Sequence, residues 1–422
     1  MKKFLFVTIA FLFAMSVFAQ DMKKVRNFYD KKDWVKAKEA VDLMLANEKE
    51  QKNWEGWYYK GLIYREYGKD PNLKAAIPDV WNGAFDAFQK AWAYDSSKML
   101  AYVALLRYEP VFDNYLWLQR EGNDFYNAKD YPNALKKYKD ADVVGRFIYK
   151  RGWALSAVDT VLYYYAGAAA MQSENMEDAI SFFKKICDAG IGGEGYDVCY
   201  RYVTYYYDSK KDFATADKYA AVGRKLYPND TYYDKMELDR ERKKGAGPEL
   251  FAKYETVLNK DAKDYDMRFD YAAELFNWVL MDNKTPEGER ETYFNKVVDQ
   301  LKKCVETDSK KPDAYLLLGK TYFNDAAFLQ DEIKKIKGTA PADVQKKNDM
   351  KAKMDARMKD AIPNLESAFN IFEGMNQAEV MKDRRMKNEY KSSANLLVEA
   401  YRFIGNTEKE KYYQKKYDAL NQ

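Results

Sequence analysis

Three consecutive stretches of the chain repeat one spacing of small and apolar residues. In each, a small residue is followed 12 residues later by an alanine, then by a further apolar or small residue after 4 and again after 3. The sets are Gly122, Ala134, Tyr138 and Ala141; Gly167, Ala179, Phe183 and Ile186; and Thr204, Ala216, Ala220 and Gly223. Residues 3 and 4 apart share one face of a helix. The pattern therefore predicts pairs of helices that approach closely at the first, small residue.

Turn-forming residues separate the two predicted helices, as at residues 127–130 and 208–211. The same spacing recurs less regularly elsewhere, as in Gly61 with Ala84, Phe88 and Ala91, where an insertion separates the two halves. We see no strong strand signal between these stretches. The alternative is an unrelated helical bundle with chance spacing, which three matching stretches in a row disfavour. The sequence thus predicts an all-α fold.

This spacing resembles the tetratricopeptide repeat (TPR), a helix–turn–helix unit of about 34 residues. The resemblance extends along most of the chain and implies an α-solenoid of about eight or nine such units in a right-handed superhelix. We expect an N-terminal array over residues 20–230 and a degenerate C-terminal array over residues 231–422. A breaker-rich cluster at residues 243–248 indicates a bend or a lobe boundary there.

A long insertion in the C-terminal array predicts a projecting helical hairpin near residues 325–362. Met350, Met354 and Met358 recur there at every fourth residue. Methionines at that spacing favour packing between the two helices, and an adaptable contact edge for another protein is the alternative.

Residues 1–19 have the features of a cleaved secretory signal. Lys2 and Lys3 precede an apolar run, and Val17 and Ala19 suit the small-residue cleavage site. The run is shorter than the ~20 residues that span a bilayer, which disfavours an uncleaved anchor. We therefore expect the mature protein in the periplasm or outside the cell, with no membrane insertion after cleavage.

Composition argues against several kinds of chemistry. The chain has no histidine, so a Ser–His or Cys–His nucleophile is excluded and the commonest metal ligand is missing. Its 70 basic and 66 acidic residues nearly balance, which argues against a nucleic-acid surface. No carboxylate stands in an apolar setting typical of a tuned acid. We expect a protein that is not an enzyme and has no cofactor or metal.

Residues 187–199, CDAGIGGEGYDVC, combine a G-x-G-x-x-G run with a cysteine at each end. A phosphate-binding loop would need a strand before the glycines, whereas a helix is predicted there. The glycines therefore indicate a helix end and a joint. Cys187 and Cys199 could form a disulfide across this joint or remain two buried thiols, and the sequence leaves both open. Cys304 is expected to be a core thiol.

The TPR resemblance implies a concave groove, lined by the first helix of each unit, that holds peptides or protein segments. By position, the groove comprises Tyr58, Arg65, Gln119, Asn123, Tyr126, Tyr164, Arg201 and Tyr205. Tyrosine and arginine are favoured at binding surfaces, and the chain has 37 tyrosines. For any single tyrosine, filling a gap between helices is the alternative. Some TPR proteins bind the C-terminal carboxylate of a partner through lysine, asparagine and arginine side chains. Only Asn123 matches such a residue here, so we do not expect the ligand to be a free chain end.

Two functional hypotheses follow from this groove. The first is a scaffold of the cell envelope that binds polypeptide segments. The second is a glycan- or nutrient-binding component of an outer-membrane uptake system, in which the tyrosines would stack on sugars.

Overall fold

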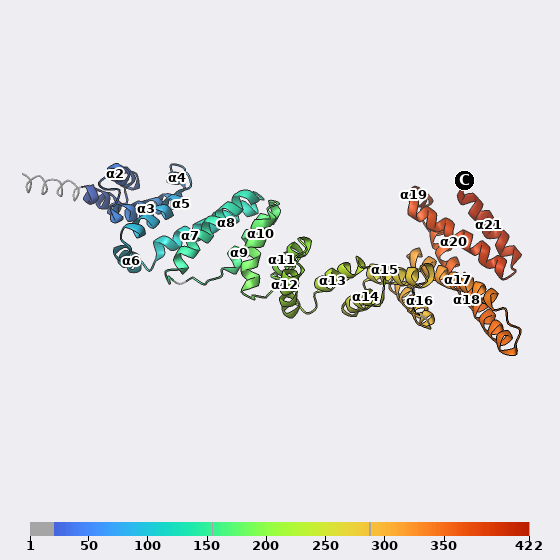
Figure 1. Ribbon diagram of the computed structural model, residues 1–422. Helices are drawn as coiled ribbons and strands as arrows, with labels where there is room; N and C mark the ends of the chain where they lie inside the picture. The colour runs from blue at the N-terminus through green and yellow to red at the C-terminus, as the bar shows by residue number, and fades with distance from the viewer. Residues whose placement is uncertain (1–20, 154, 287, 422) are drawn as a thin grey trace, which may run out of the picture. The chain divides into compact units, whose positions relative to one another are not determined.

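The computed structural model describes residues 21–153, 155–286 and 288–421 (Figure 1). Helices are the regular secondary structure throughout these ranges, and consecutive helices pack against each other as hairpins. The all-α fold of successive helical hairpins is thus confirmed. The expected signal at residues 1–19 lies outside the described residues. The chain divides into two compact units between Pro228 and Asn229, beside the expected boundary.

Unit 1 begins with a helical segment at residues 21–30. It continues with α2 (Trp34–Ala46), α3 (Trp54–Lys69), α4 (Pro71–Lys74), α5 (Val80–Tyr94), α6 (Ser96–Leu105), α7 (Glu109–Asn127), α8 (Tyr131–Tyr149), α9 (Thr160–Gln172), α10 (Met176–Asp188), α11 (Asp197–Ser209) and α12 (Phe213–Leu226). The hairpins are α3–α5, α7–α8, α9–α10 and α11–α12, and successive hairpins meet through α8–α9 and α10–α11. Helix α6 is an addition to this series and packs on α3, α5 and α7.

Unit 2 contains α13 (Tyr232–Arg242), α14 (Pro248–Lys260), α15 (Tyr265–Phe276), the π-helical η1 (Asn277–Met281), α16 (Arg290–Thr307), α17 (Pro312–Lys335), α18 (Pro341–Gly374), α19 (Gln377–Lys382), α20 (Arg384–Phe403) and α21 (Thr407–Asn421). Because α13 and α14 pack together, residues 243–248 form the turn of one hairpin. A lobe boundary at this cluster is therefore wrong, because the division of the chain precedes α13.

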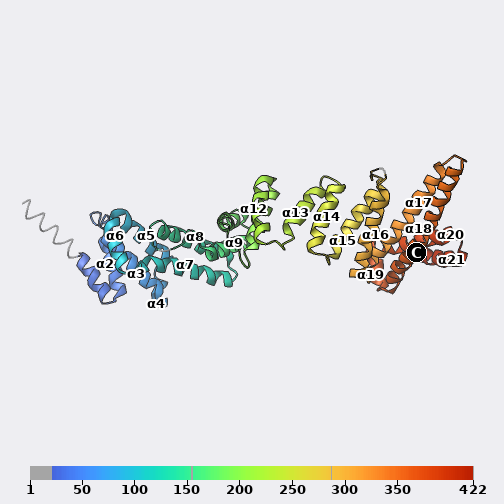
Figure 2. The same cartoon turned by 90° about the horizontal axis from the view of Figure 1, so that it is seen from below.

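Helices α17 and α18 form the long hairpin expected from the insertion, and its closed end extends beyond the neighbouring helices (Figure 2). Met354 and Met358 are buried, whereas Met350 is half-buried. The methionine stripe therefore packs between helices, as its spacing favoured. Among the described helices, none has the length and apolarity that crossing a bilayer requires.

One turn geometry recurs inside the hairpins of unit 1. A residue in the left-handed region ends one helix, and an Asp or Asn whose side chain accepts a backbone N–H begins the next. The left-handed residues are Lys32, Lys129, Glu174 and Lys211, with φ of 56°, 62°, 57° and 63°. Asp33, Asp130, Asn175 and Asp212 are the caps that follow. This turn fixes how each second helix leaves the first.

Within the hairpins, a glycine on the first helix lies against a large side chain on the second. A Cβ atom on Gly167 would be 2.4 Å from Phe183, and one on Gly122 would be 2.6 Å from Tyr138. Gly61 meets Phe88 and Gly319 meets Leu365 in the same way. The close approach expected from the repeat spacing is thus confirmed, with ring or branched side chains filling the place of the absent Cβ.

The run of glycines at residues 190–195 connects α10 to α11, with helix on both sides. Gly190, Gly193 and Gly195 have φ of 66°, 135° and 84°. The Tyr227 hydroxyl donates to the Gly193 carbonyl at 3.0 Å and accepts from its N–H at 3.2 Å. The interpretation of this run as a joint is confirmed.

We predict that Gly319→Ala destabilises unit 2 and that Gly374→Ala does not. A methyl group at residue 319 would lie 2.6 Å from Leu365 Cγ and 3.2 Å from its backbone nitrogen, whereas nothing lies within 4 Å at residue 374. Overpacking should cost about 2 kcal/mol, while alanine at the open site should gain up to about 1 kcal/mol. Hydrogen exchange of α17 and α18 amides measures both. Equal protection in the two variants would contradict the role of the close approach.

Candidate functional site

Two of the expected groove residues do not line an open surface. Tyr58 is 2% exposed, because Tyr102 of the added helix α6 packs edge-on against it at 5.6 Å between ring centroids. Arg65 is 7% exposed and forms ion pairs with Glu66, Glu109 and Asp113. The N-terminal part of the predicted groove is therefore corrected: the chain's own helices α6 and α7 cover these side chains.

The polar groove residues also have partners within the chain. Gln119 Nε2 donates to Asp159 Oδ2 at 3.2 Å, and Asn123 Oδ1 accepts from the Tyr138 hydroxyl at 2.7 Å. Arg201 forms an ion pair with Asp197 at 3.0 Å. Gln119 thus contacts the N-cap residue of α9 in the next hairpin, whereas Asn123 and Arg201 contact residues of their own hairpins. These contacts orient the surface more than they offer free groups to a ligand.

Tyr126 and Tyr164 are brought together, along with three tyrosines that we did not include in the groove. We call the set Tyr126, Tyr131, Tyr164, Tyr165 and Tyr196 the tyrosine ladder. Its successive ring centroids lie 5.4 Å apart for Tyr131–Tyr126, 5.6 Å for Tyr126–Tyr165, 5.6 Å for Tyr165–Tyr164 and 5.9 Å for Tyr164–Tyr196. The ladder therefore joins two hairpins of unit 1 by a continuous row of rings.

The local fold explains why the rings meet. Tyr126 ends the first helix of one hairpin and Tyr131 begins its second, on either side of the recurrent turn capped by Asp130. Tyr164 and Tyr165 follow each other on α9, so they point to adjacent faces. Tyr164 also rests on Phe183, the side chain that packs against Gly167, with centroids 6.4 Å apart. The glycine contact thus sets the depth of this ring.

The ladder tyrosines are partly accessible to solvent. Tyr165 is 39% exposed, and the other ladder tyrosines are half-buried. Burial, with the neighbouring tyrosines, raises the pKa of Tyr126 and Tyr164 above the usual value, so their hydroxyls stay protonated. In the described part of the chain, no hydrogen bond involves the ladder hydroxyls. They are therefore free to donate to a ligand.

Tyr205, the last predicted groove residue, is 54% exposed on α11 and makes no ring contact with the described residues. The members we missed carry a local signal, since Tyr131 follows the turn after Tyr126 and Tyr165 adjoins Tyr164 in a run of three tyrosines. Helical spacing alone assigns neighbours in sequence to different faces of a helix. It therefore does not predict that these rings belong to the same surface as Tyr126 and Tyr164.

A hollow of about 690 Å³ lies beside the end of α7, under the insertion that carries α4. Ile77, Val80 and Phe125 contribute apolar surface to it. The lysines on its edge are paired: Lys74 and Lys137 both contact Glu121, at 2.6 and 2.8 Å. These ion pairs hold the insertion against the α7–α8 hairpin.

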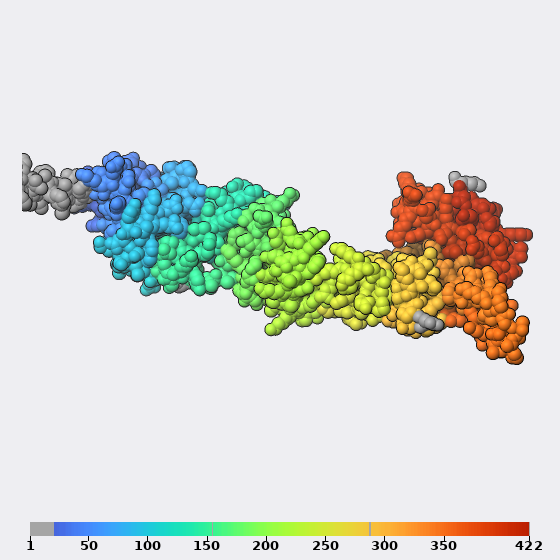
Figure 3. Space-filling view, in the orientation of Figure 1, coloured from blue at the N-terminus to red at the C-terminus, as the bar shows by residue number. Residues whose placement is uncertain are grey.

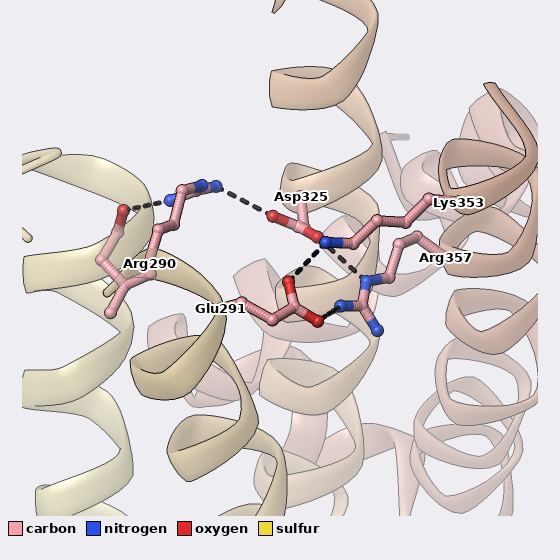
Figure 4. Close-up of polar contacts among 6 residues, drawn as sticks. Arg290, Glu291, Asp325, Lys353 and Arg357 are labelled. Atoms are coloured by element: carbon pink, nitrogen blue, oxygen red, sulfur yellow. Dashed lines mark hydrogen bonds and ion pairs between the residues drawn. The ribbon is translucent and has the colours of Figure 1, made fainter. Parts of the chain in front are cut away.

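A second polar cluster, in unit 2, joins three helices (Figure 4). Asp325 of α17 is 3% exposed and accepts from Arg290 of α16 and Arg357 of α18, each at 2.9 Å. Arg357 and Lys353 also contact Glu291, at 2.7 and 2.5 Å. Each guanidinium lies over an aromatic ring, at 3.7 Å for Arg290 on Phe328. The charged groups of the cluster pair with one another, and these ion pairs hold the α17–α18 hairpin against α16.

All three cysteines are buried free thiols. Of the two alternatives for Cys187 and Cys199, the structure therefore has the thiols and not the disulfide. Burial raises the pKa of the Cys199 thiol to about 12, so it stays protonated at neutral pH. Among the described residues, no group of three or more acidic or cysteine side chains could hold a metal ion.

The comparisons with known proteins concern the fold. No family model matches the chain, and no curated protein matches its sequence. Among solved structures, the C-terminal part of a TPR repeat-containing protein from Cytophaga hutchinsonii shares 11% identity over 71% of this chain and 94% of that chain, with a TM-score of 0.43. A TPR repeats protein from Bacteroides fragilis shares 18% identity over 66% and 98%, with a TM-score of 0.27.

YrrB, described as a TPR protein with an unusual peptide-binding site, shares 14% identity over 63% of this chain and 90% of that chain, with a TM-score of 0.22. This chain is similar to these proteins at low identity and low TM-score.

We predict that Asp325→Asn lowers the free energy of unfolding of unit 2 by about 3–5 kcal/mol, because it leaves two arginines without their buried counter-charge. Glu291→Gln is the matched control: this side chain is 49% exposed, so its ion pairs should contribute less than about 1 kcal/mol. Urea unfolding followed by hydrogen exchange of α16–α18 measures both. Similar losses in the two variants would show that the buried carboxylate is not the centre of the cluster.

Proposed function

We propose that this protein is a non-enzymatic scaffold of the cell envelope that binds polypeptide segments along the tyrosine ladder. The observation that carries the proposal is the continuous row of half-exposed rings with unpaired hydroxyls across two hairpins. Tyrosine gives a large contact area with little loss of side-chain entropy, and its hydroxyl can bond a backbone carbonyl.

The geometry of the rings favours a polypeptide over a sugar. Neighbouring ladder rings are nearly perpendicular, with interplanar angles of 72–86°. A stacked oligosaccharide needs exposed ring faces that lie parallel along its length. Rings in edge-to-face contact instead present both edges and faces, which a polypeptide with side chains of varied shape can contact. We therefore keep glycan binding as the alternative outcome of the test.

The proposed location in the envelope rests on the signal-like residues 1–19. A groove in a protein that has left the cytoplasm would meet other exported chains. The partner proposed here is therefore a protein or peptide of the same compartment, with no role for nucleic acid.

We predict that Tyr126→Ala with Tyr165→Ala weakens binding of peptides selected from a displayed random library against the full mature chain. Aromatic anchors in a binding surface contribute more than about 1 kcal/mol each, so the two substitutions together should lower the affinity by at least about 30-fold. Tyr205→Ala is the control, because this tyrosine is exposed but lies outside the ladder. Isothermal titration measures affinity, and circular dichroism checks the helical content.

The proposal fails if the library yields no binding peptide, or if the ladder variant binds the selected peptides as well as the Tyr205 variant does. Binding of an oligosaccharide array through the same tyrosines, with no peptide bound, would establish the alternative.

We predict that the exported protein begins at Gln20, because cleavage follows Ala19 in the expected signal. N-terminal sequencing of protein recovered from the host's periplasm or medium measures this directly. Ala19→Arg should slow the cleavage, since a long charged side chain does not fit a small-residue site. Recovery of full-length protein only from the cytoplasm would contradict the proposed location.

A further inference from the structure

The hollow of about 690 Å³ beside the end of α7 is a surface that the proposed function does not use. We call it the α4 hollow. Ile77 and Val80, which are buried, and Phe125, which is half-buried, give it apolar surface. No ladder tyrosine is among the residues that line it. The α4 hollow is therefore distinct from the tyrosine ladder.

The chain holds this hollow open by fixing the insertion that forms one of its sides. Lys74 contacts Glu121 at 2.6 Å near one end of the insertion. At the other end, Asp79 contacts Lys136 and Lys137, each at 2.7 Å. Hydrogen bonds from these two lysines lower the pKa of Asp79 to about 2, so the carboxylate stays ionised at neutral pH. The hollow is thus a fixed feature of unit 1.

One charge in the lining has no partner. Lys74 and Lys137 are ion-paired, and Asp79 and Glu121 are the carboxylates that pair with them. Asp124, the third carboxylate of the lining, is exposed. Within residues 21–153, 155–286 and 288–421, its side chain forms no ion pair or hydrogen bond. The α4 hollow therefore combines apolar surface with a single negative charge that is available to a ligand.

We propose that the α4 hollow binds a lysine or arginine side chain of a polypeptide, with the aliphatic stem against Ile77 and Phe125 and the charged head on Asp124. This inference goes beyond the proposed function, because it assigns a binding site outside the tyrosine ladder and gives the ligand a charge.

The chemistry of the lining selects this occupant. Lysine and arginine bury their stems along apolar surface and keep the charged head in water. Buried apolar side chains next to an exposed carboxylate match both parts. An acidic side chain would meet Asp124 with like charge, and a neutral apolar side chain would leave that carboxylate without a counter-charge.

The size of the hollow favours a residue within a chain over a small free amine. Its volume lies in the range of about 300–1,000 Å³ that is typical of ligand sites. There is room for a long side chain together with the backbone on either side of it. A polypeptide therefore fills the α4 hollow better than an isolated alkylamine does.

Titration of the full mature chain with two blocked tripeptides tests the inference, with the methyl NMR signals of Ile77 and Val80 as reporters. The first tripeptide has lysine between two alanines. The second has norleucine in place of lysine, which keeps the stem and lacks the ammonium group. We expect both to shift the two signals. The lysine tripeptide should bind about two- to fivefold more tightly, which is the contribution of an exposed ion pair.

Variants of Asp124 test the role of its charge. Asp124→Asn should give the two tripeptides equal affinity, and Asp124→Lys should make the norleucine tripeptide the tighter ligand. Asp30→Asn is the matched control, because Asp30 is exposed, lies outside the lining and forms no side-chain ion pair or hydrogen bond with the described residues. It should keep the preference for lysine. Each variant is read as a ratio of two affinities, so a change in the shape of the hollow affects both tripeptides alike.

Four outcomes would overturn the inference. Equal affinity of the two tripeptides for the unaltered chain would exclude a cationic ligand. Loss of the preference in Asp30→Asn as well would show that overall charge, and not Asp124, attracts lysine. Shifts with n-butylammonium but with neither tripeptide would make the hollow a site for small amines. Unchanged Ile77 and Val80 signals with every probe would exclude the α4 hollow as a site.

The result is separate from the test of the proposed function. The Ile77 and Val80 methyl groups report on the α4 hollow, whereas the library peptides are tested against substitutions in the tyrosine ladder. Failure of the tripeptides leaves ladder binding intact, and failure of the ladder leaves the lysine preference of the hollow intact.

Discussion

The contact between a glycine on one helix and a large side chain on the next is the constraint from which the rest of each hairpin follows. Gly61, Gly122, Gly167 and Gly319 each leave room that a ring or branched side chain fills. A Cβ atom at these positions would collide with the facing side chain. The two helices therefore come this close only where the residue is glycine. The contact sets the spacing of the helices, and the short turns then set their direction.

The tyrosine ladder is a consequence of that spacing. Phe183 fills the space at Gly167 and supports Tyr164, which in turn meets Tyr196 and Tyr165. A ring that would otherwise enter the core is therefore held at the surface, at a fixed depth. In unit 2, Leu365 replaces the aromatic residue at Gly319 and a cluster of charges around Asp325 links the helices instead. In Figure 3 the colour follows residue number, from blue to green over unit 1 and from yellow-green to red over unit 2.

The repeat spacing was sufficient to predict the helical fold, because the close contact at Gly122 recurs at Gly61, Gly167 and Gly319. It could not predict the covering of Tyr58 by α6, since that helix lies outside the repeat and its position depends on contacts with three other helices. The ladder was found only in part for a similar reason. Tyr131 and Tyr165 reach Tyr126 across a turn and a neighbouring hairpin, and helical periodicity describes one helix at a time. The cluster at residues 243–248 was read as the end of an array, but it forms the turn of one hairpin. Glycine and proline occur at both kinds of place, so the sequence does not distinguish them.

The left-handed turn residues have a further consequence for how this architecture tolerates change. Lys32, Lys129, Glu174 and Lys211 hold a backbone conformation that glycine adopts at lower energy. Glycine there would relieve that strain but would also free the unfolded chain and loosen the connection. Bulkier residues therefore strain the folded turn but restrict the unfolded chain, and they keep a stiffer joint between helices. Where the joint carries rings on both sides, as between Tyr126 and Tyr131, the fixed backbone keeps those rings in one arrangement.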